Sequence, residues 1–460
     1  MTIEAINPTN GTFIKQYKAH TSQQIKTILD NVNKAWHDWS ATPFKARAKL
    51  MHKVADTLRK NKTNYATIMT KEMGKPISDA IAEVEKCATV CDFYATHASN
   101  FLAPQKIKTN GMQSYVAFKP LGVILAVMPW NYPLWQVFRF AAPTLMAGNG
   151  VILKHASNVP ACALIIEELF ANAGFPKNLF RTLLVSSNQV AALIANPIVQ
   201  GVSLTGSVAA GKSVASTAGK YLKKVVLELG GSDPYLILKD ADIEKAATAA
   251  ISSRFKNGGQ TCIAAKRLIV VKSIAKTFTD HCLRLTKNYT VGDPMNHTTQ
   301  IGPMARFDLR DQIHAQVTAT IAKGAKCLLG GKVPKKGTLA HGAFYPPTLL
   351  TNVKKGMPAY EEEIFGPVAA IIEVADQEEA IKVANDSSFG LAGAVFSENI
   401  NTAEHIAHHK INTGICFVNH QAFSHPQLPF GGIKESGYGR ELSHFGIMEF
   451  VNVKTIAIKK

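Results

Sequence analysis

Apolar residues recur along the chain with two different periods. Over residues 21–105 they lie three and four positions apart, as in ARAKLMHKVADTLRKN and SDAIAEVEKCATVCDFYATHA, and this spacing predicts helices. From residue 113 the pattern changes, because QSYVAFKPLGVILAV reads as two extended segments around a Lys-Pro-Leu-Gly bend. The chain is therefore expected to begin with a mostly helical region that leads into strands.

Between residues 122 and 231, short unbroken apolar runs alternate with helical patterns. GVILAV (122–127), GVILK (150–154), GVSLTG (201–206) and KKVVLELGG (223–231) have the length and composition of buried parallel strands. The segments PLWQVFRFAAPTLMAG and PACALIIEELFANAG between them end in glycine, as helices commonly do. This alternation predicts a doubly wound α/β fold of the dinucleotide-binding type.

A second alternating region follows Gly231. The runs PYLILKD, RLIVV, FGPVAAIIEV, GLAGAVF and TGICFVN are predicted strands, with helices expected near 241–255 and 273–288. This region predicts a second α/β domain. The C-terminal stretch EFVNVKTIAIKK alternates as a strand does but has no local partner. We expect it to pair either with another subunit or with the ribbon at 113–121.

Length and charge narrow the class of protein. A chain of 460 residues is expected to form about two to four substructures. The net charge of +18 and the pI near 9.5 would suit nucleic-acid binding. The densest lysine runs, however, are only pairs (Lys223-Lys224 and Lys335-Lys336), and none alternates with aromatic residues. The sequence therefore predicts lysines spread over solvated faces, small anionic ligands and no nucleic-acid partner.

The cysteines and the N-terminus indicate the compartment. Seven cysteines in a chain of this length are not a disulfide framework, and no His/Cys cluster has the spacing of a zinc site. The start MTIEAINPTNG lacks the features of a signal peptide, and no apolar stretch of about eighteen residues predicts a membrane span. We expect a cytoplasmic protein without a metal or a membrane partner.

One cysteine has an unusual context. NGGQTCIAAKR (257–267) places Cys262 behind two adjacent glycines, which permit unusual dihedrals and close backbone approach. The stretch is too polar to be core, so the thiol is expected to face a partner, although most cysteines are small buried hydrophobes. The turn TGSVAAG (205–211), between a predicted strand and helix, suits a phosphate but is also ordinary α/β architecture.

Five segments together resemble the aldehyde dehydrogenase superfamily in content, order and spacing. They are PWNYP (129–133), LELGG (227–231), GQTC (259–262), EEIFGPV (362–368) and LPFGGIKESGYGRE (428–441). NYPLWQVFRFAAP, KHASNVPA, VLELGGSDPY and RELSHFG are similar to its bacterial succinate-semialdehyde dehydrogenase branch. The resemblance spans essentially the whole chain. It implies a Rossmann-type cofactor domain, a second α/β catalytic domain and a small β arm for oligomerisation. The expected bounds are 1–110 and 125–228 for the first, 229–420 for the second, and 111–124 and 441–460 for the arm.

The resemblance implies three catalytic residues. Cys262 would add to the aldehyde carbon as a thiolate and leave later from a thioester. Glu228 ends an apolar strand, where burial should raise its pKa, and would activate water for hydrolysis. Asn131 would stabilise the oxyanion together with the Cys262 backbone N–H. From the residues alone, a salt-bridged glutamate and an N-cap asparagine remain alternatives for Glu228 and Asn131.

The resemblance also implies a dinucleotide site. Its residues would be Trp130, Lys154, Ser157, Gly206, Ser207, Glu363 and Phe365. NAD-preferring relatives often carry glutamate where this chain has Ser157. A serine hydroxyl can donate to a 2′-phosphate that a carboxylate would repel, and Lys154 adds a positive charge. We expect NADP to be preferred and NAD to be used less well.

The substrate residues follow from the same resemblance. Arg139, eight residues after Asn131, would hold a substrate carboxylate, and Lys256 would be the second basic residue, without the fork of an arginine. A salt bridge is the alternative for Arg139. The remaining expected substrate residues are Trp135, Phe138, Thr261 and Phe430, and core packing is an equally good account of the aromatic ones.

The predicted function is the NAD(P)-dependent oxidation of succinate semialdehyde to succinate by a homodimer or homotetramer. A dehydrogenase for broader aliphatic or other ω-carboxy aldehydes is one alternative. A catalytically idle binding or structural protein on the same fold is the other.

Overall fold

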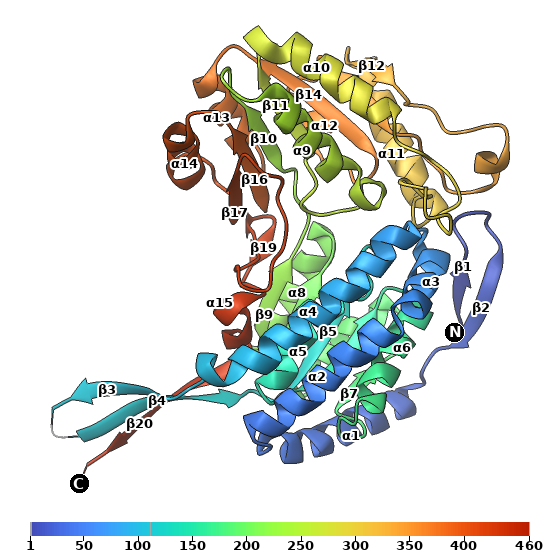
Figure 1. Ribbon diagram of the computed structural model, residues 1–460. Coiled ribbons are helices and arrows are strands. Elements are labelled where there is room, and N and C mark those ends of the chain that lie inside the picture. The colour runs from blue at the N-terminus through green and yellow to red at the C-terminus, as the bar shows by residue number, and fades with distance from the viewer. Residues whose placement is uncertain (1, 111, 460) are drawn as a thin grey trace.

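The computed structural model describes residues 2–110 and 112–459 as two α/β lobes, a projecting β arm and an N-terminal hairpin (Figure 1). Residues 1, 111 and 460 of the domain bounds expected from the sequence lie outside the described residues. The bounds themselves remain predictions.

The first lobe is built on a six-stranded sheet of order β19-β9-β8-β5-β6-β7. Its parallel strands are β5 (Val123–Met128), β6 (Gly150–His155), β7 (Phe180–Thr182), β8 (Val199–Thr205) and β9 (Lys224–Glu228), and β19 (Gly437–Tyr438) joins antiparallel. β5 pairs with β6 on one side and β8 on the other. Successive strands therefore extend the sheet to one side from β5 to β7 and to the other side from β8 to β9. α/β folds bind ligands at the strand ends beside such a switch point.

Helices cover both faces of this sheet. They are α1 (Ser22–Ser40), α2 (Phe44–Lys60), α3 (Lys62–Met73), α4 (Ile77–Phe101), α5 (Trp135–Met146), α6 (Pro160–Asn172), α7 (Val190–Ala195), α8 (Val208–Lys220) and α15 (Ser443–Met448). α5 is buried along its whole length because α2, α4 and the sheet enclose it. The helical pattern of residues 21–105 thus becomes the layer that supports the loop after β5.

The second lobe contains a seven-stranded sheet of order β12-β13-β14-β11-β10-β16-β17. Its strands are β10 (Pro234–Ile237), β11 (Arg267–Val271), β12 (Lys326–Leu329), β13 (Thr348–Thr351), β14 (Val368–Val374), β16 (Ala392–Phe396) and β17 (Ile415–Val418). Its helices are α9 (Ile243–Phe255), α10 (Lys272–Lys287), α11 (Phe307–Ala322), α12 (Pro358–Glu361), α13 (Gln377–Asn385) and α14 (Ile400–His409). All pairs but β12–β13 are parallel, as the apolar runs predict.

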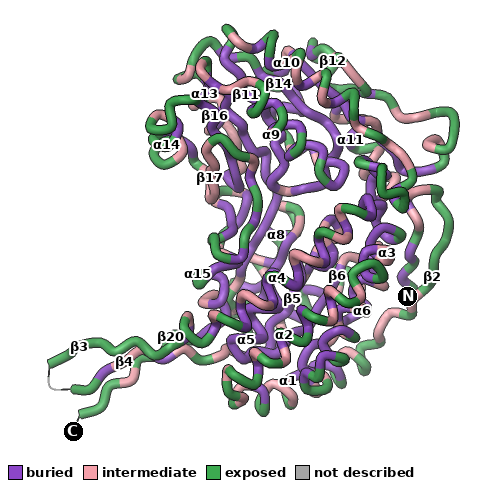
Figure 2. Tube along the Cα trace, viewed as in Figure 1, coloured by how far each residue is buried: buried purple, intermediate pink, exposed green. Residues whose placement is uncertain are grey.

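The arm is a three-stranded antiparallel sheet of β3 (Gln105–Thr109), β4 (Met112–Pro120) and β20 (Val451–Ile458). Val451 pairs with Pro120 and Ile458 with Gln113, so the C-terminal strand completes the ribbon at 113–121, one of the two expected pairings. The arm extends away from the lobes and is mostly exposed (Figures 1 and 2).

The N-terminal hairpin of β1 (Thr2–Ile6) and β2 (Phe13–Lys18) lies beside the first lobe. A small pair of strands, β15 (Phe389–Gly390) and β18 (Ile433–Lys434), brings the C-terminal motif back to the second lobe. Buried residues follow the two sheets and the helices that face them (Figure 2). None of the helices in the described ranges 2–110 and 112–459 is long and apolar enough to cross a bilayer.

Candidate active site

The loop before Cys262 has a backbone that explains its glycines. Asn257, Gly258 and Gly259 have φ values of 55°, 62° and 74°, three successive residues in the left-handed region. A Cβ at Gly259 would lie 2.2 Å from the Gly366 carbonyl oxygen, so only glycine fits there. The two glycines therefore serve a tight left-handed turn packed against the segment EEIFGPV, and Cys262 follows directly.

Buried side chains hold this loop in place. The Arg254 guanidinium donates to the carbonyls of Gly259 (2.7 Å) and Gly366 (2.6 Å), and also to that of Ile364. The Gln260 side chain accepts a hydrogen bond from the Ala305 N–H at 2.9 Å. Because these groups are enclosed, each bond is costly to lose. The loop of residues 257–262, called the nucleophile loop after the predicted role of Cys262, is therefore fixed relative to its neighbours.

Cys262 lies where two cavities meet. The inner cavity, of about 110 Å³, is lined by α4, α5, the nucleophile loop and residues 421–424. The central cavity, of about 530 Å³, is lined by the loop after β5, the start of α8 and the segment 362–365. Cys262 lines both. Its thiol thus separates a small compartment from a larger one, as a nucleophile between an aldehyde and a redox cofactor would.

Burial raises the pKa of the Cys262 thiol to about 11, while the positive charges of Arg139 and Lys266 oppose that rise. The thiol is therefore the dominant form at neutral pH, and the thiolate is a minor form. Of the other cysteines, Cys87, Cys91, Cys162 and Cys282 are buried. Cys327 and Cys416 are partly buried and line neither cavity.

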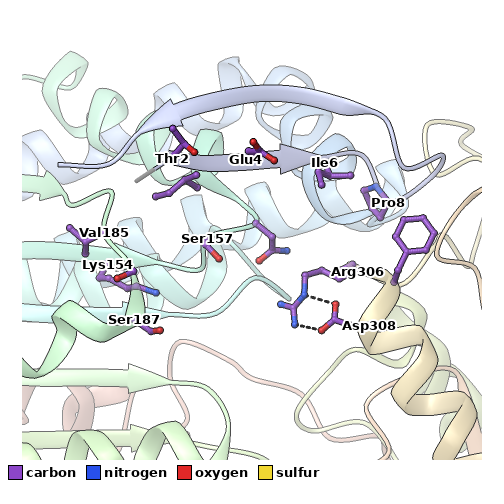
Figure 3. A pocket seen from close by; sticks show the side chains of 15 residues that line it. Thr2, Glu4, Ile6, Pro8, Lys154, Ser157, Val185, Ser187, Arg306 and Asp308 are labelled. Atoms are coloured by element: carbon purple, nitrogen blue, oxygen red, sulfur yellow. Dashed lines mark hydrogen bonds and ion pairs between the residues drawn. The ribbon is translucent and has the colours of Figure 1, made fainter. Parts of the chain in front are cut away.

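A third cavity, the hairpin cavity, holds about 660 Å³ between the N-terminal hairpin and the first lobe (Figure 3). Lys154, in β6, and Ser157, just after it, line one side, and Thr2, Glu4 and Ile6 of β1 line the other. Arg306 lines both the hairpin and the central cavities. The two cavities together have the extent and the cations that a dinucleotide needs.

The residues expected to hold the dinucleotide divide between these two cavities. Lys154 and Ser157 line the hairpin cavity, and the other five line the central cavity: Trp130, Gly206, Ser207, Glu363 and Phe365. Ser207 is the N-cap of α8 and accepts from the Ala210 N–H, so the N-terminus of this helix begins at the cavity that Gly206 and Ser207 line, and a helix N-terminus suits a phosphate. The described residues thus fit NADP, and their individual roles remain predictions.

Glu228 ends β9 in a buried cluster of charges. Both of its carboxyl oxygens are buried and have no hydrogen-bond partner among the described residues. Burial raises the pKa of Glu228 well above its usual value; Arg139 opposes this, and Glu441 adds to it. A carboxylate with a raised pKa binds a proton more readily than an exposed one, which suits the predicted general base.

Asn131 lies between the nucleophile loop and the central cavity. Its side-chain amide donates to the Gln260 carbonyl at 3.0 Å, and Asn257 donates to the Asn131 carbonyl at 2.8 Å. An amide nitrogen carries two hydrogens, so one N–H of Asn131 remains for an oxyanion. The structure brings Asn131 next to the loop of Cys262, and its catalytic role stays a prediction.

Arg139 lines the inner cavity but has an anion within its own chain. Its guanidinium forms a buried ion pair with the Glu441 carboxylate, and it stacks over the Phe430 ring at 4.3 Å. An arginine on this apolar helix needs an anionic partner, and Glu441 supplies it. Its role toward a substrate carboxylate stays a prediction.

Four other expected substrate residues line the inner cavity: Trp135, Lys256, Thr261 and Phe430. Phe138 is not among the residues that line it, and its role toward a substrate stays a prediction. It is fully buried and stacks on Phe170 at 5.5 Å. This places the Phe138 ring against α6, which carries Phe170.

Lys266 was missed in the sequence. Its ammonium donates to the carbonyls of Thr261 (3.2 Å) and Cys262 and forms an ion pair with Glu363 at 3.2 Å. The Gly231 N–H donates to the same Glu363 carboxylate at 3.1 Å. Lys266 thereby ties the nucleophile loop to the segment EEIFGPV. A lysine directly before a strand is usually expected to be exposed to solvent. The only feature of the sequence that could have indicated its role is its position four residues after Cys262.

Within residues 2–110 and 112–459, no group of three or more His, Cys, Asp or Glu side chains is arranged to hold a metal ion.

The chain is similar over its whole length to known proteins. The model of the aldehyde dehydrogenase family matches residues 1–456. A Synechocystis sp. protein named "probable succinate-semialdehyde dehydrogenase [NADP(+)]" is 48% identical over 458 residues, covering 100% of both chains. An Escherichia coli succinate semialdehyde dehydrogenase [NAD(P)+] is 43% identical, covering 98% of this chain and 97% of its own. The crystal structure of succinic semialdehyde dehydrogenase from Streptococcus pyogenes with NADP+ is 39% identical, with a TM-score of 0.96 and full coverage of both chains.

Proposed function

Since this chain belongs to the aldehyde dehydrogenase family and is an oxidoreductase that acts on aldehydes, we propose that it oxidises succinate semialdehyde to succinate with NADP as the preferred oxidant. The overall reaction consumes the aldehyde, NADP+ and water and yields succinate, NADPH and two protons. The observation that supports it best is the position of Cys262, which lines both the inner and the central cavity.

Each proposed catalytic group has a defined task. The Cys262 thiolate forms a bond to the aldehyde carbon, and the free N–H of Asn131 and the Cys262 backbone N–H stabilise the resulting oxyanion. NADP+, held by the residues that line the hairpin and central cavities, would supply the hydride acceptor. Glu228 then takes a proton from water, which attacks the thioester and releases succinate and the thiol.

A kinetic matrix tests this function. Succinate semialdehyde, glutarate semialdehyde and hexanal should each be measured with NADP and with NAD, following absorbance at 340 nm. The proposal expects the highest kcat/KM for succinate semialdehyde with NADP. A higher value for hexanal would favour the broad aliphatic alternative, and no signal with any aldehyde would favour the idle protein.

Cofactor preference should respond to Ser157. In Ser157→Glu, the ratio of kcat/KM for NADP over NAD should fall about tenfold or more, because a carboxylate in the hairpin cavity repels a 2′-phosphate and accepts from a 2′-hydroxyl. Calorimetric titration with NADP and NAD should show the same change in dissociation constants. Ser157→Ala, which removes the hydroxyl without adding charge, should have a smaller effect. An unchanged ratio in Ser157→Glu would remove Ser157 from the proposal.

We also propose that the arm joins copies of this chain into a homodimer or homotetramer. The register places Ile107, Met112, Val116, Phe118 and Val453 on one face of its sheet. Ile107 and Val453 are 48% and 57% exposed, so a single copy leaves this apolar face in water.

Charges on that face should weaken the assembly. The double variant Ile107→Glu/Val453→Glu should have a lower mass than wild type in light scattering after size-exclusion chromatography, because a carboxylate is costly to bury. Lys108→Glu/Lys454→Glu alters the opposite face of the same strands and is the matched control. Equal masses for wild type and the apolar-face variant would contradict this role of the arm.

A further inference from the structure

Helix α4 presents one face to the inner cavity. Asp79, Ala82, Glu83 and Lys86 all line it, at positions separated by three, one and three residues, which is the spacing of one helical face. Two of these side chains are acidic and one is basic, so the charge that an incoming aldehyde meets depends on which of them already have partners.

Glu83 is fully engaged. One carboxylate oxygen accepts from the backbone N–H groups of Leu134 and Trp135, both at 2.9 Å, and the other forms a buried ion pair with Lys75. Glu83 therefore stabilises the beginning of α5, where a negative charge is favourable. Arg139, which lines the same cavity from α5, is likewise balanced by Glu441.

Lys86 has no such balance. Its ammonium donates to the Ser424 hydroxyl at 2.6 Å and lies 4.2 Å from the centre of the Trp135 ring. In the part of the chain that the structure describes, no carboxylate lies within ion-pair distance of it. Its contacts are thus a neutral hydroxyl and an aromatic face, which leave the positive charge without a counterion.

The charged groups around Lys86 add to this imbalance. Burial, Lys256 and Arg139 lower the pKa of the Lys86 ammonium to about 7, and Cys87 and Glu83 on its own helix oppose this only in part. Asp79, the other acidic residue in the cavity, accepts from the Asn257 N–H at 3.1 Å. An anion bound beside Lys86 would offset these costs, because an opposite charge favours the charged form.

We propose that Lys86 binds the carboxylate of the aldehyde substrate in the inner cavity, with the Ser424 hydroxyl as a second donor, and so sets the preference for ω-carboxy aldehydes over neutral ones. This inference rests on the proposed function. Arg139 is already neutralised by Glu441, whereas the positive charge of Lys86 has no carboxylate partner in the described chain and can bind that of the substrate. Three donor hydrogens on the ammonium allow one to stay with Ser424 while another reaches the substrate.

The test compares succinate semialdehyde with butanal, which has the same number of carbons and no carboxylate. In Lys86→Met, KM for succinate semialdehyde should rise about 10- to 100-fold with a much smaller change in kcat, and the ratio of kcat/KM for the two aldehydes should fall by a similar factor. Lys86→Arg, which keeps the charge, should recover most of that ratio. Ser424→Ala should lower it less than Lys86→Met does.

Lys49→Met, which removes a positive charge from an exposed position of α2, is the matched control and should keep the wild-type ratio. A Lys86→Met enzyme with the wild-type ratio would overturn this inference while leaving the proposed function intact. A wild-type enzyme that does not favour succinate semialdehyde over butanal would instead overturn the proposed function. An equal loss for both aldehydes in Lys86→Met, unrecovered in Lys86→Arg, would show a structural role and also contradict the inference.

Discussion

Replacing Cys262 with serine should lower kcat for succinate semialdehyde by on the order of 10⁴-fold, the scale seen when a covalent nucleophile is removed. A serine hydroxyl is far less acidic than a thiol, and no histidine lines either cavity around this position within the described residues to activate it. Burial already makes the thiol a weak acid, with a pKa of about 11, so a still weaker acid should add to the aldehyde very slowly. Steady-state and single-turnover absorbance at 340 nm measure this loss.

Two controls make the result specific. Cys327→Ser alters another partly buried cysteine outside both cavities and should retain wild-type turnover. Titration of Cys262→Ser with NADP should give a dissociation constant close to that of wild type, because the thiol is only one of many groups lining the central cavity. Wild-type turnover in Cys262→Ser would refute the covalent mechanism.

Replacing Glu228 with glutamine should slow release of the product by about 10²- to 10⁴-fold, the usual contribution of a general base. The amide keeps the size of the buried side chain but cannot take a proton from water. Aldehyde and NADP should then give a rapid burst of about one NADPH for each active site, followed by slow turnover. Intact-protein mass spectrometry of the quenched enzyme should find a succinyl group on Cys262.

The pH dependence distinguishes this role from others. Because burial raises the pKa of Glu228, its carboxylate form is scarce at low pH and grows as the pH rises toward that raised value, so thioester hydrolysis should accelerate with pH. Glu228→Gln should lose this dependence. Glu435→Gln, at an exposed glutamate paired with Lys212, is the matched control and should keep it. A Glu228→Gln enzyme without a burst would mean that Glu228 acts before the hydride leaves, for example on the thiol.

The fold was predictable where burial leaves a local pattern. β5, β6, β8 and β11 are unbroken apolar runs because helices cover both faces of their sheets, and each expected run overlaps the observed strand. The hairpin of β1 and β2 was not predicted, since most of its residues are exposed and it depends on a distant surface of the first lobe. Helix α11 and strand β12 were also missed, because exposed residues interrupt their apolar pattern, and β13 was missed because its buried run is only four residues long and includes two threonines.

The residues of the candidate site could be predicted from motifs, but the ion pairs that balance their charges could not. Cys262, Asn131 and Glu228 stand in recognisable segments; the fold places Cys262 and Asn131 on the central cavity and buries Glu228 at the end of β9. The partner of Arg139 is Glu441, about three hundred residues away, and no local pattern could show that this arginine is already neutralised. For Lys86 the sequence was misleading in the opposite way. On a helix of mixed polarity it looks like a surface lysine, and only the packing of α4 against α5 places it in the inner cavity.

The hairpin cavity has a consequence for protein engineering. Thr2, Glu4 and Ile6 stand across from Lys154 and Ser157, so a wall of the cavity proposed to hold part of the dinucleotide comes from the first few residues of the chain (Figure 3). Libraries aimed at exchanging one coenzyme for the other should randomise β1 together with the end of β6. For the same reason, a purification tag fused ahead of Thr2 would begin at the rim of that compartment, whereas one fused at the other terminus would emerge from the remote tip of the arm.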